Sequence, residues 1–231
     1  MRTLGLIGGM TWHSTADYYR LINQGVQERL GGSHSAELLM LSVDFAPVEE
    51  LQNRGEWEAM GQLMAGAART LERGGAEAIV ICANTMHRLA GDVTAAVKIP
   101  LIHIADAAAA AVKARGLKTV GLLGTRYTME MDFYRGRLEA PHGLSVLVPD
   151  EPGRTTVHDV IYRELGRGLV RDESRRRYLE IIEDLVRRGA QGVILGCTEI
   201  PMLVRPQDSP VPIFDTTALH AAAAVDFALS D

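Results

Sequence analysis

The chain has 231 residues, of which 47% are hydrophobic and 23% are charged, and its 24 basic and 29 acidic side chains give a net charge of −5. This composition excludes a disordered or collagen-like chain, and the acidic balance argues against binding along a nucleic-acid backbone. The longest apolar runs fall well short of the ~18 residues of a membrane span, and two cysteines cannot form a disulfide framework. We therefore expect a cytoplasmic α/β protein that acts on a small molecule, with neither nucleic acid nor membrane as a partner.

Short aliphatic runs alternate with helical patterns along the chain. Helices are predicted from Ser14 to about Arg29, from Trp57 to Leu71, where apolar residues recur at helical spacing, and from Asp106 onward. Strands are predicted at residues 3–7, 38–43, 78–81, 100–104, 119–123, 144–148, 193–195 and 212–214. Continuously apolar strands joined by helices are typical of parallel sheets that are covered on both faces.

An internal repeat accounts for most of these strands. Residues 3–9 resemble 119–125, residues 75–85 resemble 189–199, and residues 99–102 resemble 211–214, at offsets of 116, 114 and 112 residues. Three matches in the same order predict two similar lobes, each a small Rossmann-like or flavodoxin-like sheet. We assign residues 1–105 and about 210–231 to an N-terminal lobe and residues 106–209 to a C-terminal lobe. The last strand and helix could pack on either lobe.

Four loops follow strand ends and precede helices. In open α/β sheets ligands bind beyond the carboxyl ends of the strands, so these loops are expected to surround one cleft. Helix starts also present unpaired N–H groups to which carboxylates bind. The loops carry small polar side chains, Asn84, Thr85, Thr125 and Thr198, which could contact a ligand or serve only as helix caps.

The two cysteines differ in their expected roles. Cys197 follows an apolar strand and opens a helix, a position that favours the thiolate, although most free cysteines are small buried hydrophobes. In the repeat, Cys82 aligns with Gly196, and Ala83 aligns with Cys197. Because neighbouring side chains of an extended segment point to opposite sides, we expect Cys82 to face the core if Cys197 faces the cleft.

Neither a metal nor a cofactor is predicted. The histidines, among them His13, His87 and His103, show no metal-ligand spacing. The first glycine loop lacks the full G-x-G-x-x-G form, and the sequence contains no Walker signature.

Four motifs resemble those of the aspartate/glutamate racemases that work without pyridoxal phosphate. They are Gly8-Gly9-Met10-Thr11-Trp12, Asn84-Thr85-Met86-His87, Gly196-Cys197-Thr198-Glu199 and Phe214-Asp215-Thr216, supported by residues 52–57 and 124–129. The resemblance extends over essentially the whole chain. It implies two Rossmann-like lobes related by a pseudo-twofold axis, an active site between them, an acidic amino-acid substrate, no cofactor and a homodimer.

The resemblance also implies roles for individual residues. Racemases of this kind remove an α-proton with one thiol and return a proton to the opposite face with another, and Cys197 matches the second thiol. Substrate contacts are implied for Met10, Gln52, Asn84, Thr85, Thr198 and Glu199, and we add Thr125 from the loop pattern. We expect Glu199 to contact substrate through its backbone N–H or through the substrate ammonium group, the alternative being an acid that only stabilises a helix start.

The chain departs from the family pattern at one catalytic position. Ala83 stands where the pattern places the first thiol, and a closely similar subgroup carries threonine there. Alanine has no transferable proton, so a water molecule or the Thr85 hydroxyl is expected to complete the transfer. We therefore hypothesise a racemase of aspartate or glutamate that is weak or one-sided. The alternatives are a single-thiol enzyme, such as a relative of arylmalonate decarboxylase or another isomerase, and a non-catalytic amino-acid or dicarboxylate binding protein.

Overall fold

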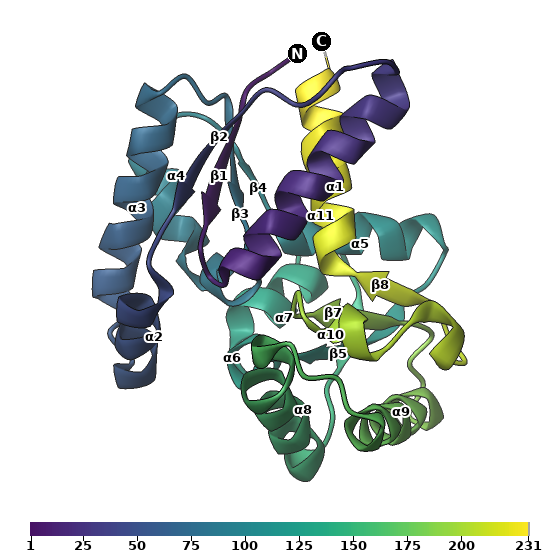
Figure 1. Cartoon of the computed structure of the whole chain (residues 1–231). Helices are drawn as coiled ribbons and strands as arrows, with labels where there is room; N and C mark the ends of the chain where they lie inside the picture. The colour runs from purple at the N-terminus through teal and green to yellow at the C-terminus, as the bar shows by residue number, and fades with distance from the viewer. Residues whose placement is uncertain (231) are drawn as a thin grey trace. The chain divides into compact units, whose positions relative to one another are not determined.

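The computed structural model describes residues 1–230, and these form two compact units (Figure 1). The first unit contains residues 1–103 together with the chain from His220 onward, and the second contains Ile104–Leu219. Each unit is built around a four-stranded sheet in which all strand pairs are parallel. The prediction of an α/β fold with two similar lobes is therefore confirmed.

The sheet of the first unit has the strand order β2-β1-β3-β4. Its strands are β1 (Leu4–Gly8), β2 (Leu38–Ser42), β3 (Ala78–Ile81) and β4 (Leu101–Ile102). The elements between them are α1 (Trp12–Leu30), α2 (Phe45–Arg54), α3 (Trp57–Arg73), the 3-10 helix η1 (Thr85–Leu89) and α4 (Ala90–Ala96). Figure 1 shows α2, α3 and α4 on one side of this sheet, with α1 and α11 on the other.

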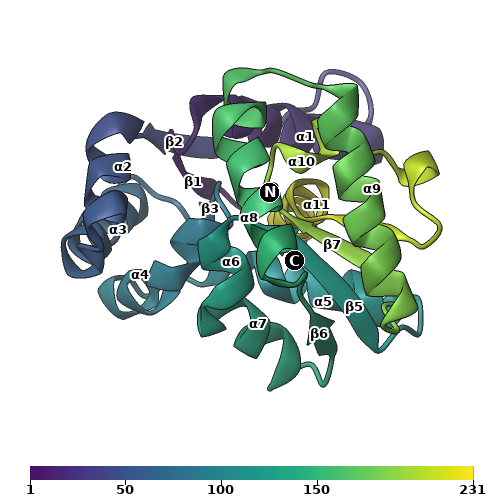
Figure 2. The ribbon, with the colours of Figure 1, turned by 90° about the horizontal axis from the view of Figure 1, so that it is seen from below.

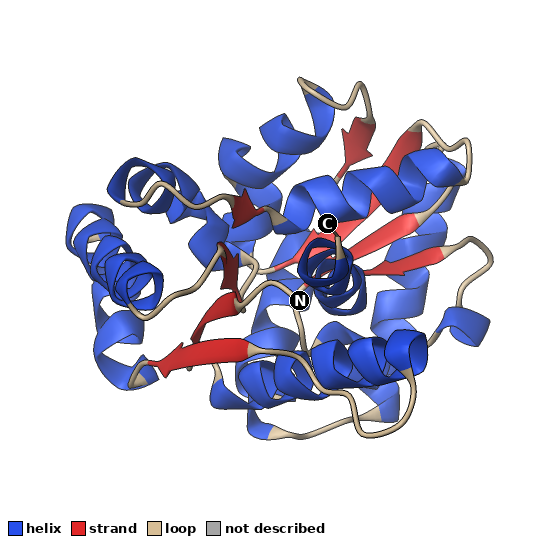
Figure 3. Cartoon of the chain, turned by 90° about the horizontal axis from the view of Figure 1, so that it is seen from above, coloured by secondary structure: helices blue, strands red, loops and turns tan. Residues whose placement is uncertain are grey.

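The sheet of the second unit has the equivalent order, β6-β5-β7-β8. Its strands are β5 (Thr119–Gly124), β6 (Ser145–Leu147), β7 (Val193–Gly196) and β8 (Ile213–Asp215). The helices are α5 (Ile104–Ala114), α6 (Arg126–Glu130), α7 (Asp132–Glu139), α8 (Glu151–Arg163), η2 (Leu165–Arg167), α9 (Asp172–Arg187), α10 (Ile200–Leu203) and η3 (Pro206–Asp208). The last helix, α11 (Thr216–Leu229), begins in this unit and continues into the first. Figures 2 and 3 show helices covering the strands of each sheet.

Alternate side chains of each strand enter different hydrophobic clusters. In β3, Ile79 and Ile81 pack with the α3 and α4 side, whereas Ala78 and Val80 pack with α1 and α11. This alternation is the period of two of an extended chain. It continues past the end of β3, so consecutive residues of the following loop also lie on opposite faces of the sheet.

The strand register supports the second offset of the internal repeat. In the first sheet Ile7 pairs with Ile81, and in the second sheet Leu123 pairs with Leu195. Ile7 and Leu123 are already matched by the 116-residue offset between β1 and β5. Ile81 and Leu195 are therefore structurally equivalent, which is the 114-residue offset of the second repeat.

The same register extends into the loops that follow β3 and β7. Two residues beyond the equivalent pair, Ala83 and Cys197 occupy matching positions, and Cys82 matches Gly196. Cys82 is fully buried on the α1 and α11 side, with Tyr18 among its cluster. The expectation that Cys82 faces the core is confirmed.

Two element boundaries in the structure differ from the predicted ones. The first helix begins at Trp12, because the Ser14 hydroxyl is buried and donates to the carbonyls of Thr11 and Cys82 (2.9 and 3.2 Å) instead of capping a helix start. The predicted strand at 100–104 shortens to two residues, because Ile104 already begins α5.

The last strand lies with the second unit, whereas the sequence assignment placed residues from about 210 onward in the N-terminal lobe. β8 pairs in parallel with β7, and the division falls inside α11. From Ala221 onward α11 packs its small side chains against α1 in the first unit.

Within residues 1–230, the helices are too short or too polar to cross a bilayer.

Candidate functional site

Cys197 lies directly after β7, at the carboxyl end of the second sheet. The strand is fully buried, and the side chain of Cys197 is 8% exposed, within the cluster that Val157 of α8 and Tyr178 of α9 help to form. Continuation of the strand alternation explains this placement, because Val193, Leu195 and Cys197 belong to the same cluster. The thiol is therefore held in a mainly apolar setting.

The Cys197 thiol has a direct proton acceptor. Its Sγ atom donates to Oε2 of Glu199 at 2.9 Å, and the Thr198 hydroxyl donates to the same oxygen at 2.6 Å. Residues 197–199 thus form a hydrogen-bonded group in which one carboxylate oxygen accepts two hydrogen bonds. Glu199 was expected to contact substrate, and the hydrogen bond that its side chain accepts from the thiol was not predicted from the sequence.

The electrostatics of the thiol differ from the expectation of a stabilised thiolate. The pKa of Cys197 is raised well above its ordinary value of 9.0, chiefly by burial and then by the charge and the hydrogen bond of Glu199. The backbone N–H groups of Glu199 and Thr198 lower the pKa, as the helix-start argument predicts, but they are outweighed. The expectation of a thiolate is wrong for this structure, because the thiol is buried and a carboxylate faces the sulfur. Cys197 rests as a thiol whose proton points at a base.

The equivalent loop of the first unit carries different chemistry. Ala83 is 7% exposed and packs in the cluster that contains Ile81 and Met86. Asn84 is also buried, and Thr85 is half-buried at the start of η1. The Ala83 carbonyl accepts a hydrogen bond from Nδ1 of His87 at 2.8 Å. On the face that holds Ala83, this loop offers peptide groups, an amide and a hydroxyl, whereas its thiol, Cys82, is buried on the opposite face of the sheet.

The loop after β1 lies beside β3 in the same sheet. Gly9 has a φ of +95°, and a Cβ atom there would lie 2.2 Å from the Val43 carbonyl oxygen, so only glycine fits. The Gly9 N–H donates to the Thr15 hydroxyl at 2.8 Å, which ties the loop to α1. Met10 is buried in the same cluster as Ala83. The structure therefore places Met10, a predicted contact residue, in one cluster with Ala83, the position of the missing first thiol.

Two further predicted contact residues, Gln52 and Thr125, belong to different units. Gln52 is buried on α2, beside the cluster that holds Met10 and Ala83. Thr125 follows β5 in the second unit, and its hydroxyl accepts the Thr128 N–H at 3.4 Å. Thr125 thus acts as the cap of α6, the structural role that the sequence analysis left open. It directly follows Gly124, whose register partner Gly196 precedes Cys197, so the two loops start side by side.

A buried histidine group in the first unit has no counterpart in the predicted site. The ring centroid of His87 lies 4.7 Å from that of His103 and 5.4 Å from that of His220. His220 in turn bonds to the Tyr18 hydroxyl through Nδ1 and to the Ile102 carbonyl through Nε2, at 2.8 and 2.7 Å. The sequence analysis noted His87 and His103, but nothing in the sequence connects them with His220 and Tyr18. Over residues 1–230, no cluster of three or more His, Cys, Asp or Glu residues is arranged to hold a metal ion.

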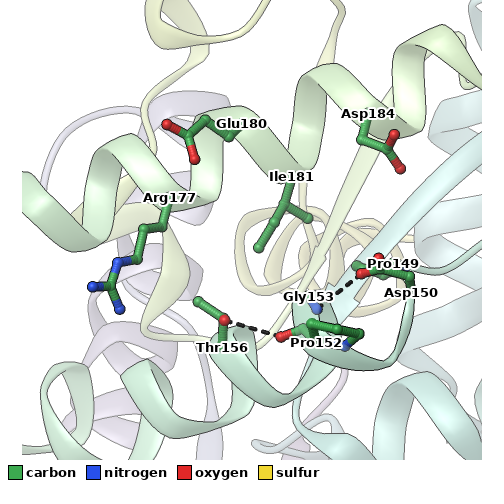
Figure 4. A pocket seen from close by; sticks show the side chains of 9 residues that line it. All are labelled: Pro149, Asp150, Pro152, Gly153, Thr156, Arg177, Glu180, Ile181 and Asp184. Atoms are coloured by element: carbon green, nitrogen blue, oxygen red, sulfur yellow. Dashed lines mark hydrogen bonds between the residues drawn. The ribbon is translucent and has the colours of Figure 1, made fainter.

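A surface groove in the second unit is separate from these loops. It has a volume of about 270 Å³ and lies between the start of α8 and the exposed side of α9 (Figure 4). Three of its charged side chains are engaged, since Asp150 accepts the Gly153 N–H, Asp184 pairs with Arg187 and Arg188, and Arg177 pairs with Glu173. Three of its lining residues are acidic, so the groove does not suit an acidic ligand.

Comparison with known proteins places these loops in a wider context. The chain matches the family of Asp/Glu/hydantoin racemases over residues 7–224. A Yersinia pestis protein that is named only provisionally as an Asp/Glu racemase is 53% identical, with a TM-score of 0.95 and full coverage of both chains. An aspartate racemase homologue from Pyrococcus horikoshii OT3 is 35% identical, with a TM-score of 0.87 and full coverage of both chains.

A third relative matches only in part. The glutamate racemase of Synechococcus sp. (strain CC9605) is 33% identical over 127 residues, which are 54% of this chain and 45% of that protein. This chain therefore matches less than half the length of that relative. The similarities to the two solved structures extend over the full length of both chains, and they agree with the two-unit topology described above.

Proposed function

Because the chain belongs to the Asp/Glu/hydantoin racemase family, we propose that it is a cofactor-independent racemase of acidic amino acids in which Cys197 carries the proton transfer. The single observation that supports this most strongly is the 2.9 Å contact between the Cys197 thiol and the Glu199 carboxylate, at the carboxyl end of β7. A buried thiol with a carboxylate as its hydrogen-bond acceptor is an activated acid–base pair. A purely structural cysteine needs no such partner.

The proton balance of the proposed reaction is simple. The Cys197 thiol passes its proton to the Glu199 carboxylate, which leaves a thiolate beside a neutral acid and creates no net charge. The thiolate then takes the α-proton of the amino acid and becomes a thiol again, while the substrate becomes a carbanion. Hydrogen-bond donors around the substrate carboxylate stabilise the developing negative charge. We assign this role to the loop groups of Asn84, Thr85 and Thr198, with Met10, Gln52 and Thr125 bordering the ligand.

The first unit completes the reaction without a thiol. The register makes Ala83 equivalent to Cys197, and a methyl group cannot supply a proton. We propose that a water molecule or the Thr85 hydroxyl protonates the carbanion on that side, slowly. The hydroxide or alkoxide that this leaves is neutralised through solvent by the proton held on Glu199, which restores the carboxylate. The reaction is then one-sided: one enantiomer exposes its α-proton to Cys197 and the other does not.

The decisive experiment is proton NMR in D₂O with L- and D-aspartate and L- and D-glutamate. Loss of the α-proton signal from at least one of the four, abolished in a Cys197→Ala variant, supports the proposal. The matched control is Cys82→Ala, which removes the other cysteine from the core and should retain exchange. Unchanged exchange in the Cys197→Ala variant would exclude thiol chemistry at this residue.

A second candidate function is favoured because only one of the two equivalent positions, 83 and 197, carries a thiol. A single-thiol decarboxylase needs only one protonation step, and one protonating group suffices for it. Substituted malonates separate the two candidates, because a decarboxylase releases carbon dioxide from them and a racemase does not. A binding protein is the third possibility, and it gives neither exchange nor decarboxylation while still retaining affinity for an acidic amino acid.

A further inference from the structure

His87 holds the loop that contains Ala83 and Asn84 by two hydrogen bonds. Its Nδ1 atom lies 2.8 Å from the Ala83 carbonyl oxygen, and its backbone N–H lies 3.1 Å from the Asn84 carbonyl oxygen. Two consecutive carbonyl groups of the loop therefore point toward one residue. The side chain holds the first of these carbonyls and the backbone N–H holds the second, and His87 is 2% exposed.

The partners of these rings determine their tautomers. A carbonyl oxygen only accepts, so the His87 proton is on Nδ1. By the same argument His220 carries its proton on Nε2, which donates to Ile102, and its Nδ1 accepts from the Tyr18 hydroxyl. The pKa of His87 is lowered well below its ordinary value by burial and then by His103 and His220. His87 and His220 are thus neutral, and each of these hydrogen bonds has a defined direction.

The carbonyl directions also orient the loop's N–H groups. In a trans peptide the C=O and the following N–H point in opposite directions. Since the carbonyls of Ala83 and Asn84 point to His87, the N–H groups of Asn84 and Thr85 point away from it. A carbonyl that accepts a hydrogen bond also polarises its own peptide group and makes the N–H a stronger donor. His87 therefore turns two neighbouring donors to the same side of the loop and strengthens the first.

We propose that His87 is a positioning residue that aims the N–H groups of Asn84 and Thr85 at the carboxylate of an acidic ligand. This inference rests on the proposed function for its ligand class and goes beyond it, since no role in the reaction was assigned to His87. The second unit shows that the fold does not require such a residue. Four residues after Cys197 stands Pro201, which has no side-chain donor, yet β7 and its loop keep the matching register.

Two isosteric variants separate positioning from bulk. His87→Asn places an amide donor near the former Nδ1, whereas His87→Gln places it near the former Nε2. Both remove the ring contacts with His103 and His220, so both should lower the thermal midpoint to a similar extent. Only the Gln variant should raise KM, by about five- to tenfold as for one lost neutral hydrogen bond, with kcat little changed. His34→Asn, at an exposed histidine of the same unit, serves as the control.

A second readout needs no turnover. Nitrogen-15 NMR of the His87 ring should show the Nδ1-protonated neutral tautomer at pH 7.5. The amide signals of Asn84 and Thr85 should coincide in the wild type and the Asn variant and should shift in the Gln variant. An Nε2-protonated or charged ring, or equal effects of the two variants on these amides, overturns the proposal. Absence of exchange from all four acidic amino acids would instead contradict the proposed function, and the NMR results would still decide the role of His87.

Discussion

The loops after β3 and β7 follow the same path on the two sheets but carry opposite kinds of chemistry. After β7, a thiol, a hydroxyl and a carboxylate form a closed proton-transfer group at 2.6–2.9 Å. After β3, the equivalent position is a methyl group, and the contacts are carbonyls held by a buried neutral histidine. The comparison shows that the two units keep the same strand register while the equivalent position changes from a thiol to a methyl group. Under the proposed function, we call the loop after β7 the reactive loop and the loop after β3 the binding loop.

The largest effect is expected when the reactive loop loses its base. Glu199→Gln keeps the shape of the side chain but cannot take a proton from Cys197. We expect α-proton exchange in D₂O to fall at least about 100-fold, the lower range of a general-base contribution. Since the charge and hydrogen bond of Glu199 both raise the pKa of Cys197, the same variant should alkylate with iodoacetamide at lower pH than the wild type. Exchange at the wild-type rate in the Gln variant would remove Glu199 from the mechanism.

The histidine group behind the binding loop predicts acid sensitivity. Burial lowers the pKa of His220 to about 4, from its ordinary value of 6.5. The unfolded chain therefore binds the proton first, so this contribution to stability is complete above about pH 6.5 and decreases as the pH falls toward 4. We expect the free energy of unfolding to fall by about 2 kcal/mol between pH 7 and pH 5 from this group. Urea denaturation at the two pH values measures it.

The control for this pH dependence is His220→Gln. Its amide can replace the Nε2 donor to the Ile102 carbonyl, but it does not titrate. The variant should be less stable at pH 7 and should show a flatter dependence on pH than the wild type. An identical slope in both proteins would assign the acid sensitivity to other groups.

A thiol in the binding loop should make the two loops alike. Ala83→Cys places a sulfur at the register equivalent of Cys197. We expect racemisation in both directions to increase by roughly tenfold, at the low end of an added general acid, because no carboxylate equivalent to Glu199 accompanies the new thiol. Polarimetry from each enantiomer measures the effect. A folded variant with unchanged rates in both directions would show that this position does not reach the substrate.

The smallest effect is expected at Thr125. Its hydroxyl caps α6 through the Thr128 N–H, so Thr125→Ala should lower the free energy of unfolding by about 1 kcal/mol. If Thr125 only borders the ligand, KM should change less than twofold. A KM increase above about tenfold, with little loss of stability, would assign it a direct contact instead.

The central strands β1, β3, β5 and β7 were predictable because they are almost entirely buried. Ala78–Ile81 was predicted to the residue, since a continuous apolar run flanked by glycine and polar residues has few other solutions. The boundaries set by side-chain bonding were less predictable. Ser14 has the residue type of a helix cap, but its hydroxyl bonds to the Cys82 carbonyl 68 residues away.

The candidate site was predictable in its residues and less so in its electrostatics. Cys197 and Glu199 are adjacent enough to be found as a motif, but their spacing does not reveal that the carboxylate turns back to the sulfur and raises the thiol pKa. The histidine group could not be predicted from the sequence for a different reason. Tyr18 and His220 are 202 residues apart in the chain, and only the packing of α11 against α1 brings them together.

Under the proposed function, the thiol that takes the α-proton lies in the loop after β7, and the equivalent position of the loop after β3 is a methyl group. The most direct test compares the initial rates of α-deuterium incorporation from the L- and D-forms of the preferred acidic amino acid in D₂O. We predict that one enantiomer exchanges at least tenfold faster than the other and initially retains its configuration, because Cys197 can return solvent deuterium to the face from which it took the proton. Equal initial rates from both enantiomers would contradict the account.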